Sequence, residues 1–428
     1  MKSKPFLISV FFVLIISVSF FQTASAQLKP GDPIIIGVPS ALGSSNGRDS
    51  WMAIQMAVDE INAKGGVQVG GTKHLLKAYS IDTREHEPGI PVHDALIAVE
   101  KLILEKKPHV ILLGAFRSEI LVASMDLVSK YKIPYLCSIA MTPVMQTKIL
   151  EDYDKYKYMF RICLNAQHFV RYLTQVMGFM GKEFGFNKSH IVVQDVLWAT
   201  GSGKGMEKWL KENNWQVTGF DSYPVGATDF SPSLIKVRAQ KAQVITAVFD
   251  MTQSIILLKQ SHAMKVPALI CGQIEPAGPA YSWDASEGAV EGMVNFMFDI
   301  GAISVKAIPK SVAFIENFGK KWGKDARGRI TNHGPGPSYD SVYVFADAIE
   351  RAKTVDPDAV VSALEKTDMS GVVGRIRFGK DHQVAYGLDP KETALSCAFQ
   401  WKKPGTRVVV YPETVAEGKI ELPPYMMK

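Results

Sequence analysis

The feature that most constrains the fold is a repeated alternation between short apolar runs and amphipathic helical segments. An apolar run of strand length at 34–38 is followed by a Gly- and Ser-rich loop at 43–47. Helical periodicity then continues until Gly65 and Gly66 end it. Strands that are separated by helices pair in parallel, so this opening predicts the first unit of an α/β sheet.

The same alternation runs along the chain in two series. The first series predicts strands at 34–38, 77–81, 110–113 and 133–137 and helices at 92–105 and 120–130. The second predicts helices at 166–184, 206–213, 231–240 and 253–264 and strands at 190–194, 216–223, 244–248 and 268–271. Later segments include an extended run at 292–298, helices at 311–322 and 339–353, and strands at 372–378, 394–401 and 407–411. We therefore predict an α/β fold with two Rossmann-like, parallel-sheet lobes.

Composition excludes several classes of protein. With 428 residues, 47% of them hydrophobic, the chain can bury more than one core and is not disordered. The net charge of +6 is not concentrated in a basic run, which argues against a nucleic-acid partner. The four cysteines are far apart in sequence and form no CxxC pair, so neither a zinc site nor a disulfide framework is expected.

The N-terminus has the order of a secretory signal. Lys2 and Lys4 precede an apolar run at 6–21, and the small residues at 24–26 match a signal peptidase site. We expect cleavage after Ala26 and export to the periplasm, without stable membrane insertion afterwards. An uncleaved membrane anchor is the alternative, although the run is short and contains serines.

Motifs for catalysis or cofactor binding are weak. The glycine-rich segment 201–205 lacks the spacing of a Walker A loop and is interpreted as a flexible turn between a strand and a helix. His86 and His93, with Glu85 nearby, are interpreted as solvated loop residues rather than metal ligands. No nucleophile and base form a recognisable arrangement. We expect no cofactor, no metal and no enzymatic activity.

Five sequence blocks occur in order along almost the whole chain after residue 26. They are 36–38 with 53–66, 114–118 with 133–134, 226–231, 253–260, and 339–341 followed by 356–360 and 371–378. Together they resemble the periplasmic solute-binding proteins of ABC transporters, in the branched-chain amino-acid (Leu/Ile/Val-binding) group with the type I periplasmic fold.

This resemblance implies two discontinuous lobes and a ligand held between them. After the signal peptide at 1–26, the first lobe would comprise 27–161 plus 297–377, and the second 162–296 plus 378–428. Three crossings near 160–163, 294–298 and 376–380 would form the hinge. The expected function is capture of a small carboxylate-bearing solute by hinge closure, and its delivery to ABC permease subunits by a monomer. The alternative is a sensor that presents its ligand to a membrane receptor.

The resemblance also implies ligand-binding residues in the first lobe. In relatives, the counterparts of Ser118 and of the stretch 138–142, including Ala140 and Thr142, hold the ligand carboxylate through hydroxyls and backbone amides. Physical reasoning agrees, because Ser118 opens a predicted helix whose free N–H groups favour an anion. Helix capping by Ser118 and Thr142 is the alternative.

In the second lobe, the resemblance implies that Asp250, Gln273 and Glu275 face the ligand ammonium. The sequence departs from the family here, because Asp250 stands where an aromatic residue is common and an extra residue precedes Glu275. Solvated loop acids are therefore the alternative interpretation.

Two arginines bear on the expected charge of the ligand. Asn46 and Arg48 in the first loop, and Arg117 before Ser118, stand in segments that face the ligand in relatives. Guanidinium groups there would suit a second acidic group on the ligand. The alternative is that Arg48 and Arg117 pair with their sequence neighbours Asp49 and Glu119.

Overall fold

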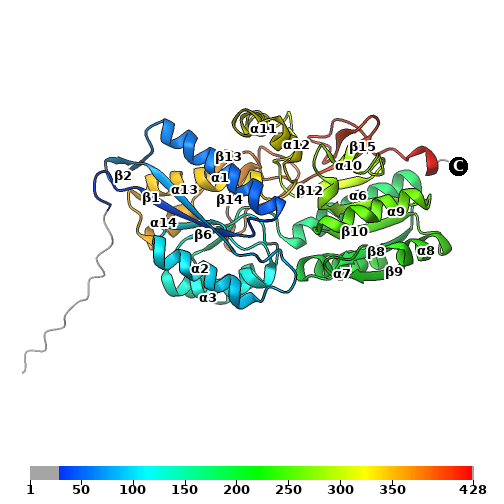
Figure 1. Ribbon diagram of the computed structural model, residues 1–428, viewed down its shortest axis with the longest axis horizontal. Coiled ribbons are helices and arrows are strands. Elements are labelled where there is room, and N and C mark those ends of the chain that lie inside the picture. The colour runs from blue at the N-terminus through cyan, green and yellow to red at the C-terminus, as the bar shows by residue number, and fades with distance from the viewer. Residues whose placement is uncertain (1–27, 427–428) are drawn as a thin grey trace, which may run out of the picture.

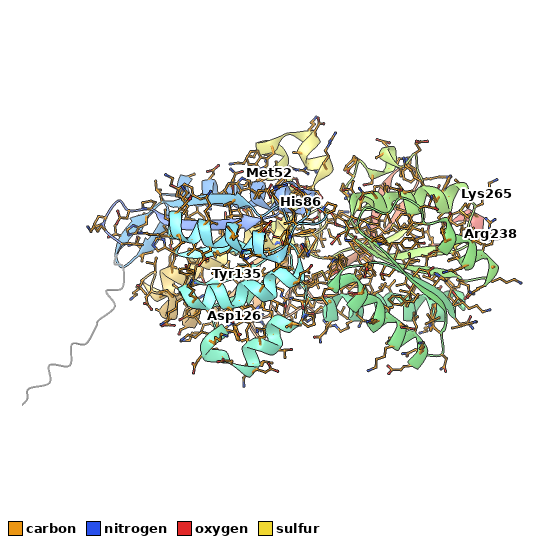
Figure 2. All side chains as sticks on the ribbon, turned by 60° about the horizontal axis from the view of Figure 1, so that its bottom comes forward. Met52, His86, Asp126, Tyr135, Arg238 and Lys265 are labelled. Atoms are coloured by element: carbon orange, nitrogen blue, oxygen red, sulfur yellow. The ribbon has the colours of Figure 1, made fainter. Side chains whose placement is uncertain are left out.

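The computed structural model describes residues 28–426 and contains two α/β lobes that lie side by side (Figure 1). Tyr135 is buried in one lobe, whereas Arg238 and Lys265 mark the far end of the other (Figure 2). The predicted signal segment 1–26 falls outside the described residues. Within 28–426, every helix is too short or too polar to cross a membrane.

The first lobe is built on a five-stranded parallel sheet in the order β4-β1-β5-β6-β7. Its strands are β1 (Ile34–Ser40), β4 (Leu76–Asp82), β5 (Val110–Leu113), β6 (Tyr135–Cys137) and β7 (Met159–Arg161). Small hairpins are formed by β2 (Val67–Val69) with β3 (Thr72–His74) and by β13 (Asp368–Gly371) with β14 (Gly374–Arg377). The helices are α1 (Ser45–Ala63), α2 (Val92–Lys106), α3 (Ser118–Tyr131), α4 (Val144–Glu151), α5 (Tyr153–Tyr156), α11 (Pro309–Trp322), α13 (Pro335–Ala352) and α14 (Pro357–Leu364).

The second lobe is built on a seven-stranded sheet in the order β16-β15-β12-β11-β10-β8-β9. Its strands are β8 (Lys188–Gln194), β9 (Gln216–Tyr223), β10 (Val244–Phe249), β11 (Leu269–Ile274), β12 (Val294–Met297), β15 (Cys397–Lys402) and β16 (Thr406–Tyr411). Its helices are α6 (Ala166–Phe184), α7 (Leu197–Glu212), α8 (Ser231–Ala239), α9 (Ile255–Ala263) and α10 (Ser282–Ala285). Strands β8 to β12 pair in parallel, and β15 and β16 extend the sheet antiparallel.

The predicted α/β architecture with two parallel-sheet lobes is therefore confirmed. One boundary was wrong at the start of the chain, because part of the predicted loop 43–47 is helical. Helix α1 begins at Ser45, where the Ser44 hydroxyl accepts a hydrogen bond from the Gly47 amide at 3.0 Å. Asn46 and Arg48 consequently lie in the first turn of α1 and not in a loop.

The glycine-rich segment 201–205 was predicted as a flexible turn, and this was wrong, because it lies inside α7. Gly203 lets this helix approach the sheet closely: an added Cβ would come within 2.7 Å of Val193 and 2.9 Å of Phe220. Gly205 similarly faces Val170 of α6. Glycine here serves close packing, and tertiary contacts offset its low helix propensity.

A segment that the sequence did not indicate runs between the lobes. We call residues 324–334 the interlobe arm; it contains the short helix α12 (Lys324–Arg329) and joins α11 to α13. The arm contacts the second lobe at Tyr281, whose amide donates to the Gly328 carbonyl at 3.3 Å. It thus brings residues that lie between two first-lobe helices against the second lobe (Figure 1).

Candidate functional site

A small pocket lies where the carboxyl ends of the strands from both sheets meet. Most of the residues that line the pocket follow a strand of one of the two sheets. The complete lining is Asn46, Phe116, Ile139, Met141, Trp198, Asp250, Gln273, Glu275, Phe298 and His333. The structure therefore brings together four of the predicted site residues: Asn46, Asp250, Gln273 and Glu275.

The first lobe supplies a mainly apolar wall. Phe116 follows β5, and Ile139 and Met141 follow β6. Asn46 is the polar residue of this first-lobe wall, and its amide nitrogen donates to the His333 carbonyl at 3.0 Å. Asn46 thereby fixes the end of the interlobe arm against helix α1.

Two serine hydroxyls are buried directly beside this wall. Ser118 is two residues beyond Phe116, and Ser138 immediately precedes Ile139. Neither hydroxyl oxygen has a hydrogen-bond partner among residues 28–426. Ser118 is the first residue of α3, and its hydroxyl does not cap that helix. A buried hydroxyl without a partner is costly, and neither serine is among the residues that line the pocket.

Thr142 and Ala140 are buried next to the wall but do not line the pocket. The Thr142 hydroxyl accepts a hydrogen bond from the Val144 amide at 3.2 Å, at the start of α4. The N-cap of α4 is Pro143, so Thr142 contacts the start of the helix from one residue before the cap and is not itself the N-cap. The Ala140 carbonyl is contacted by two cysteine thiols, those of Cys137 and Cys163.

The second lobe supplies an acidic wall, and Asp250 is its first member. This residue follows β10, and its two carboxylate oxygens accept hydrogen bonds from Gln194 at 2.6 Å and from the Trp198 indole at 2.8 Å. Burial raises the pKa of Asp250, although the two hydrogen bonds oppose that shift. Asp250 is therefore an oriented acid that fixes an aromatic side chain, and the interpretation as a solvated loop acid does not apply.

Glu275 is the second acid of this wall and is buried. Its carboxylate accepts a hydrogen bond from Gln273 at 3.0 Å and another from the Thr331 hydroxyl of the interlobe arm. Burial raises the pKa of Glu275 to about 7, against the opposing effect of Thr331 and His333. The carboxyl group is thus held near its titration point at neutral pH.

His333 was missed by the sequence analysis and connects the two lobes. Its Nδ1 lies 2.8 Å from an oxygen of Asp299, and its Nε2 lies 2.8 Å from the Ile139 carbonyl. Burial lowers the pKa of His333, but the Asp299 carboxylate and the carbonyl outweigh burial and raise it. Because both ring nitrogens face acceptors, we assign a protonated imidazole. In the sequence, the one feature that could have indicated His333 is its position next to Gly334, just before α13.

Neither predicted arginine lines the pocket. Arg48 is half exposed and donates to Asp49 at 2.9 Å. Arg117 donates to Glu119 at 2.7 Å and to the Ile90 carbonyl at 2.9 Å. Both side chains thus make the sequence-neighbour pairs that were the alternative. Among the described residues, the pocket lining contains no lysine or arginine.

Glu85 was interpreted as a solvated loop residue, and this was wrong. Its side chain is buried, with one carboxylate oxygen accepting from the Arg117 amide at 2.8 Å and the other from the Thr83 hydroxyl at 2.7 Å. It lies at the N-terminus of α3, where a helix dipole favours an anion. The neighbouring His86 lies near the junction of the lobes (Figure 2).

A pocket enclosed between the strand ends of two α/β lobes defines a two-lobed protein that binds a small solute. The profile of the periplasmic binding protein family matches residues 35–388, which is most of the chain. The chain belongs to this family and has the type I periplasmic binding fold.

Individual relatives agree with this assignment. The chain is 26% identical over 413 residues to the Leu/Ile/Val-binding protein homolog 7 of Brucella suis, covering 94% of this chain and 95% of that one. A putative branched-chain amino acid ABC transporter protein from Silicibacter pomeroyi is similar in structure, with 19% identity, a TM-score of 0.78 and coverage of 92% and 100%. The substrate-binding protein LivJ of Streptococcus pneumoniae, in complex with isoleucine, has 18% identity, a TM-score of 0.69 and coverage of 89% and 100%.

Proposed function

We propose that this protein is the extracytoplasmic solute-binding component of an ABC transporter. It captures one small, carboxylate-bearing solute of the amino-acid type between its lobes and delivers it to membrane permease subunits. In this proposal the chain is exported and cleaved after Ala26 and works as a monomer. The observation that carries the proposal is the pocket itself, which has free hydroxyls beside one wall and oriented acids on the other.

The first lobe is the proposed site for the ligand carboxylate. The hydroxyls of Ser118 and Ser138 are buried without partners, and Ser118 stands in the first turn of α3. The N-terminus of α3 already holds the Glu85 carboxylate through the Arg117 amide, so the two hydroxyls are the proposed donors to the ligand carboxylate. Ala140 and Thr142 contribute through the backbone of the same loop.

The second lobe is the proposed site for the ligand's donor group. Asp250 and Glu275 carry acceptor oxygens, and within residues 28–426 neither is paired with a lysine or arginine. An ammonium group would compensate their buried charge. The relatives named for Leu/Ile/Val binding and the isoleucine complex support a ligand of the same chemistry.

Hinge closure is the proposed mechanism of capture. Polar contacts already link the lobes through the interlobe arm: Asn332 donates to Gln273 at 3.4 Å and accepts from it at 3.2 Å, and Thr331 donates to Glu275. A ligand that contacts both walls would add to these contacts and so favour the closed arrangement. The three predicted crossings would act as the hinge.

A thermal-shift screen of the mature protein tests the proposal. Amino acids, their decarboxylated amines and their amides form matched sets, because each set keeps one side chain while the α-carboxylate is removed or neutralised. We expect an α-amino acid to raise the melting temperature, and its amine and amide analogues to have much smaller effects. Equal shifts from the amine alone would contradict the carboxylate, and the absence of any shift would contradict solute capture.

A sensor of the same fold is the alternative function. Reconstitution distinguishes the two, since a transport component stimulates ATP hydrolysis by its permease complex when the ligand is present. A sensor would bind the ligand equally well and leave transport unchanged. Recovery of the bound solute in unaltered form would further separate both functions from an enzyme.

A further inference from the structure

Two of the four cysteines meet at the first crossing between the lobes. Cys137 ends β6, and Cys163 follows the end of β7 by two residues. The Cys137 Sγ lies 3.6 Å from the Ala140 carbonyl oxygen, and the Cys163 Sγ lies 3.9 Å from the same atom. Far apart in the sequence and in no recognised motif, the two thiols are brought together by parallel strand pairing.

Arg161 is fully buried and lies two residues before Cys163 in the sequence. It faces Cys137 across the β6–β7 pair, and its Nη2 donates to the Thr142 carbonyl at 2.8 Å and to Gln146 at 2.7 Å. Its Nε and Nη1 have no hydrogen-bond partner within residues 28–426. Arg161 therefore places a positive charge beside the Cys137 thiol.

Cys137 is the more acidic thiol of the pair. Burial raises the pKa of this thiol, but a hydrogen bond from Cys163 and the Arg161 guanidinium outweigh burial and lower it to about 7. The other two cysteines behave differently, because burial alone raises the pKa of both Cys271 and Cys397. One thiol pair is thus set apart by its contacts and its charge.

We propose that Cys137 and Cys163 are a redox-active pair that is oxidised to a disulfide as the exported chain folds. This goes beyond solute binding and does not depend on the identity of the ligand. The oxidant is a disulfide, carried by an extracytoplasmic thiol oxidase or by oxidised glutathione. Because both thiols are buried in the folded protein, the exchange occurs after β6 and β7 have paired, which brings Arg161 beside Cys137, and before the rest of the first lobe covers the thiols.

The exchange balances in two displacements. The Cys137 thiolate attacks one sulfur of the oxidant, the oxidant's disulfide breaks, and its second sulfur leaves as a thiolate. Cys163 then loses its proton and attacks Cys137 Sγ, which displaces the oxidant's first sulfur. The two cysteines lose two electrons and two protons, and the oxidant is reduced to two thiols.

The bond would have a local consequence for the proposed ligand site. The loop 138–142, which follows Cys137, carries the first-lobe wall at Ile139 and Met141. A bond from Cys137 to Cys163 would fix the start of this loop to the first crossing. It would remove conformational freedom from the unfolded chain and therefore stabilise the first lobe.

Thiol trapping on the exported protein tests the proposal. Cells are quenched in acid, the protein is denatured with an alkylating agent, and its peptides are analysed by mass spectrometry. We expect a disulfide-linked peptide pair containing Cys137 and Cys163, with Cys271 and Cys397 alkylated as internal controls. Alkylation of all four cysteines, or a disulfide that involves Cys271 or Cys397, would overturn the proposal.

A stability measurement provides an independent readout. Reductant should lower the melting temperature of the wild-type protein by roughly 5 °C, and it should leave a Cys137→Ser, Cys163→Ser double variant unchanged. A Cys271→Ser variant is the matched control and should retain the wild-type response. An equal response in the wild type and the double variant would refute the disulfide, whatever solute the protein binds.

Discussion

The two walls of the pocket differ in how their polar groups are satisfied. On the first-lobe wall, the side chains that line the pocket are mostly apolar, and the adjacent hydroxyls of Ser118 and Ser138 have no partners within the described chain. On the second-lobe wall, Asp250 and Glu275 are each held by two hydrogen bonds from neighbouring side chains. One wall therefore has vacant donors, and the other has acceptors that are already oriented.

This difference indicates which wall a ligand changes most. Donors without partners gain full hydrogen bonds when a carboxylate arrives, so the first-lobe wall would contribute through newly satisfied groups. The acids are oriented in advance, and His333 is the one cationic side chain that the described pocket lining sets beside them, so the second-lobe wall would contribute electrostatically. Substitutions on each wall separate these two contributions.

The largest effect is expected from the second-lobe wall. Glu275→Gln keeps the shape of the side chain and removes its charge, and should weaken binding of the best amino acid from the screen by roughly 3 kcal/mol. Calorimetry measures this loss. The matched control is Glu287→Gln, an exposed acid of the same lobe, which should bind normally. If both variants bind like the wild type, the acidic wall does not contact the ligand.

The first-lobe wall should give a smaller loss. Ser118→Ala should weaken binding by roughly 1–2 kcal/mol, because one hydrogen bond to a carboxylate is removed. Ser124→Ala is a close control, since Ser124 is also a buried hydroxyl of α3 without a partner in the described chain. Equal losses in the two variants would point to a general effect on α3 and would count against a ligand contact at Ser118.

A pH dependence of stability follows from Glu275 in the ligand-free protein. Its pKa is about 7 in the folded chain and about 4.3 in an unfolded one, so the native state holds this proton more tightly. The free energy of unfolding should therefore fall as pH rises from about 4.5 to 7, and level off above that range. Chemical denaturation across this range measures the effect. Asp340, whose pKa burial also raises to about 7, contributes in the same direction.

Glu275→Gln isolates the share of that slope that belongs to the second-lobe wall. Between pH 5 and pH 8, the free energy of unfolding should fall less in the variant than in the wild type, because the variant has no carboxyl group at this position to ionise. Identical pH profiles of the wild type and the variant would mean that folding does not raise the pKa of Glu275.

The smallest effect is expected from the arginines beside the first-lobe wall. Arg48→Ala and Arg117→Ala should each change affinity by less than about 0.5 kcal/mol, since both side chains pair with neighbouring acids away from the pocket lining. Matched ligands with one and two carboxylates provide the measurement. A selective loss for the dicarboxylate would restore the hypothesis of a second acidic group.

Long periodic segments were predicted most accurately. Helix α6 and strands β5 and β9 have the predicted boundaries, because each carries a complete pattern with a clear end. The glycine-rich start of α7 was missed for a physical reason. Its glycines reflect contacts with Val193, Phe220 and Val170, which are distant in sequence, and local propensity favours a turn.

The candidate site was only partly accessible to sequence reasoning. Asp250, Gln273 and Glu275 were expected from the resemblance to the family, and the structure places all three in the pocket lining. His333 and the interlobe arm were not found, since the arm has no periodic pattern and its role depends on contacts with the second lobe. Glu85 was misread because a charged residue in a loop is usually solvated.

The sequence by itself determined the alternation of strands and helices, the parallel pairing and the two-lobed class, because these follow from local periodicity and connection geometry. Only the tertiary structure decided which polar groups are partnered and which are buried without partners. It placed Arg48 and Arg117 against neighbouring acids, joined His333 to both lobes, and brought Cys137 and Cys163 to one carbonyl. Such outcomes depend on side-chain contacts between distant segments, and a hydrogen bond or an ion pair exists only when both partners reach the same place.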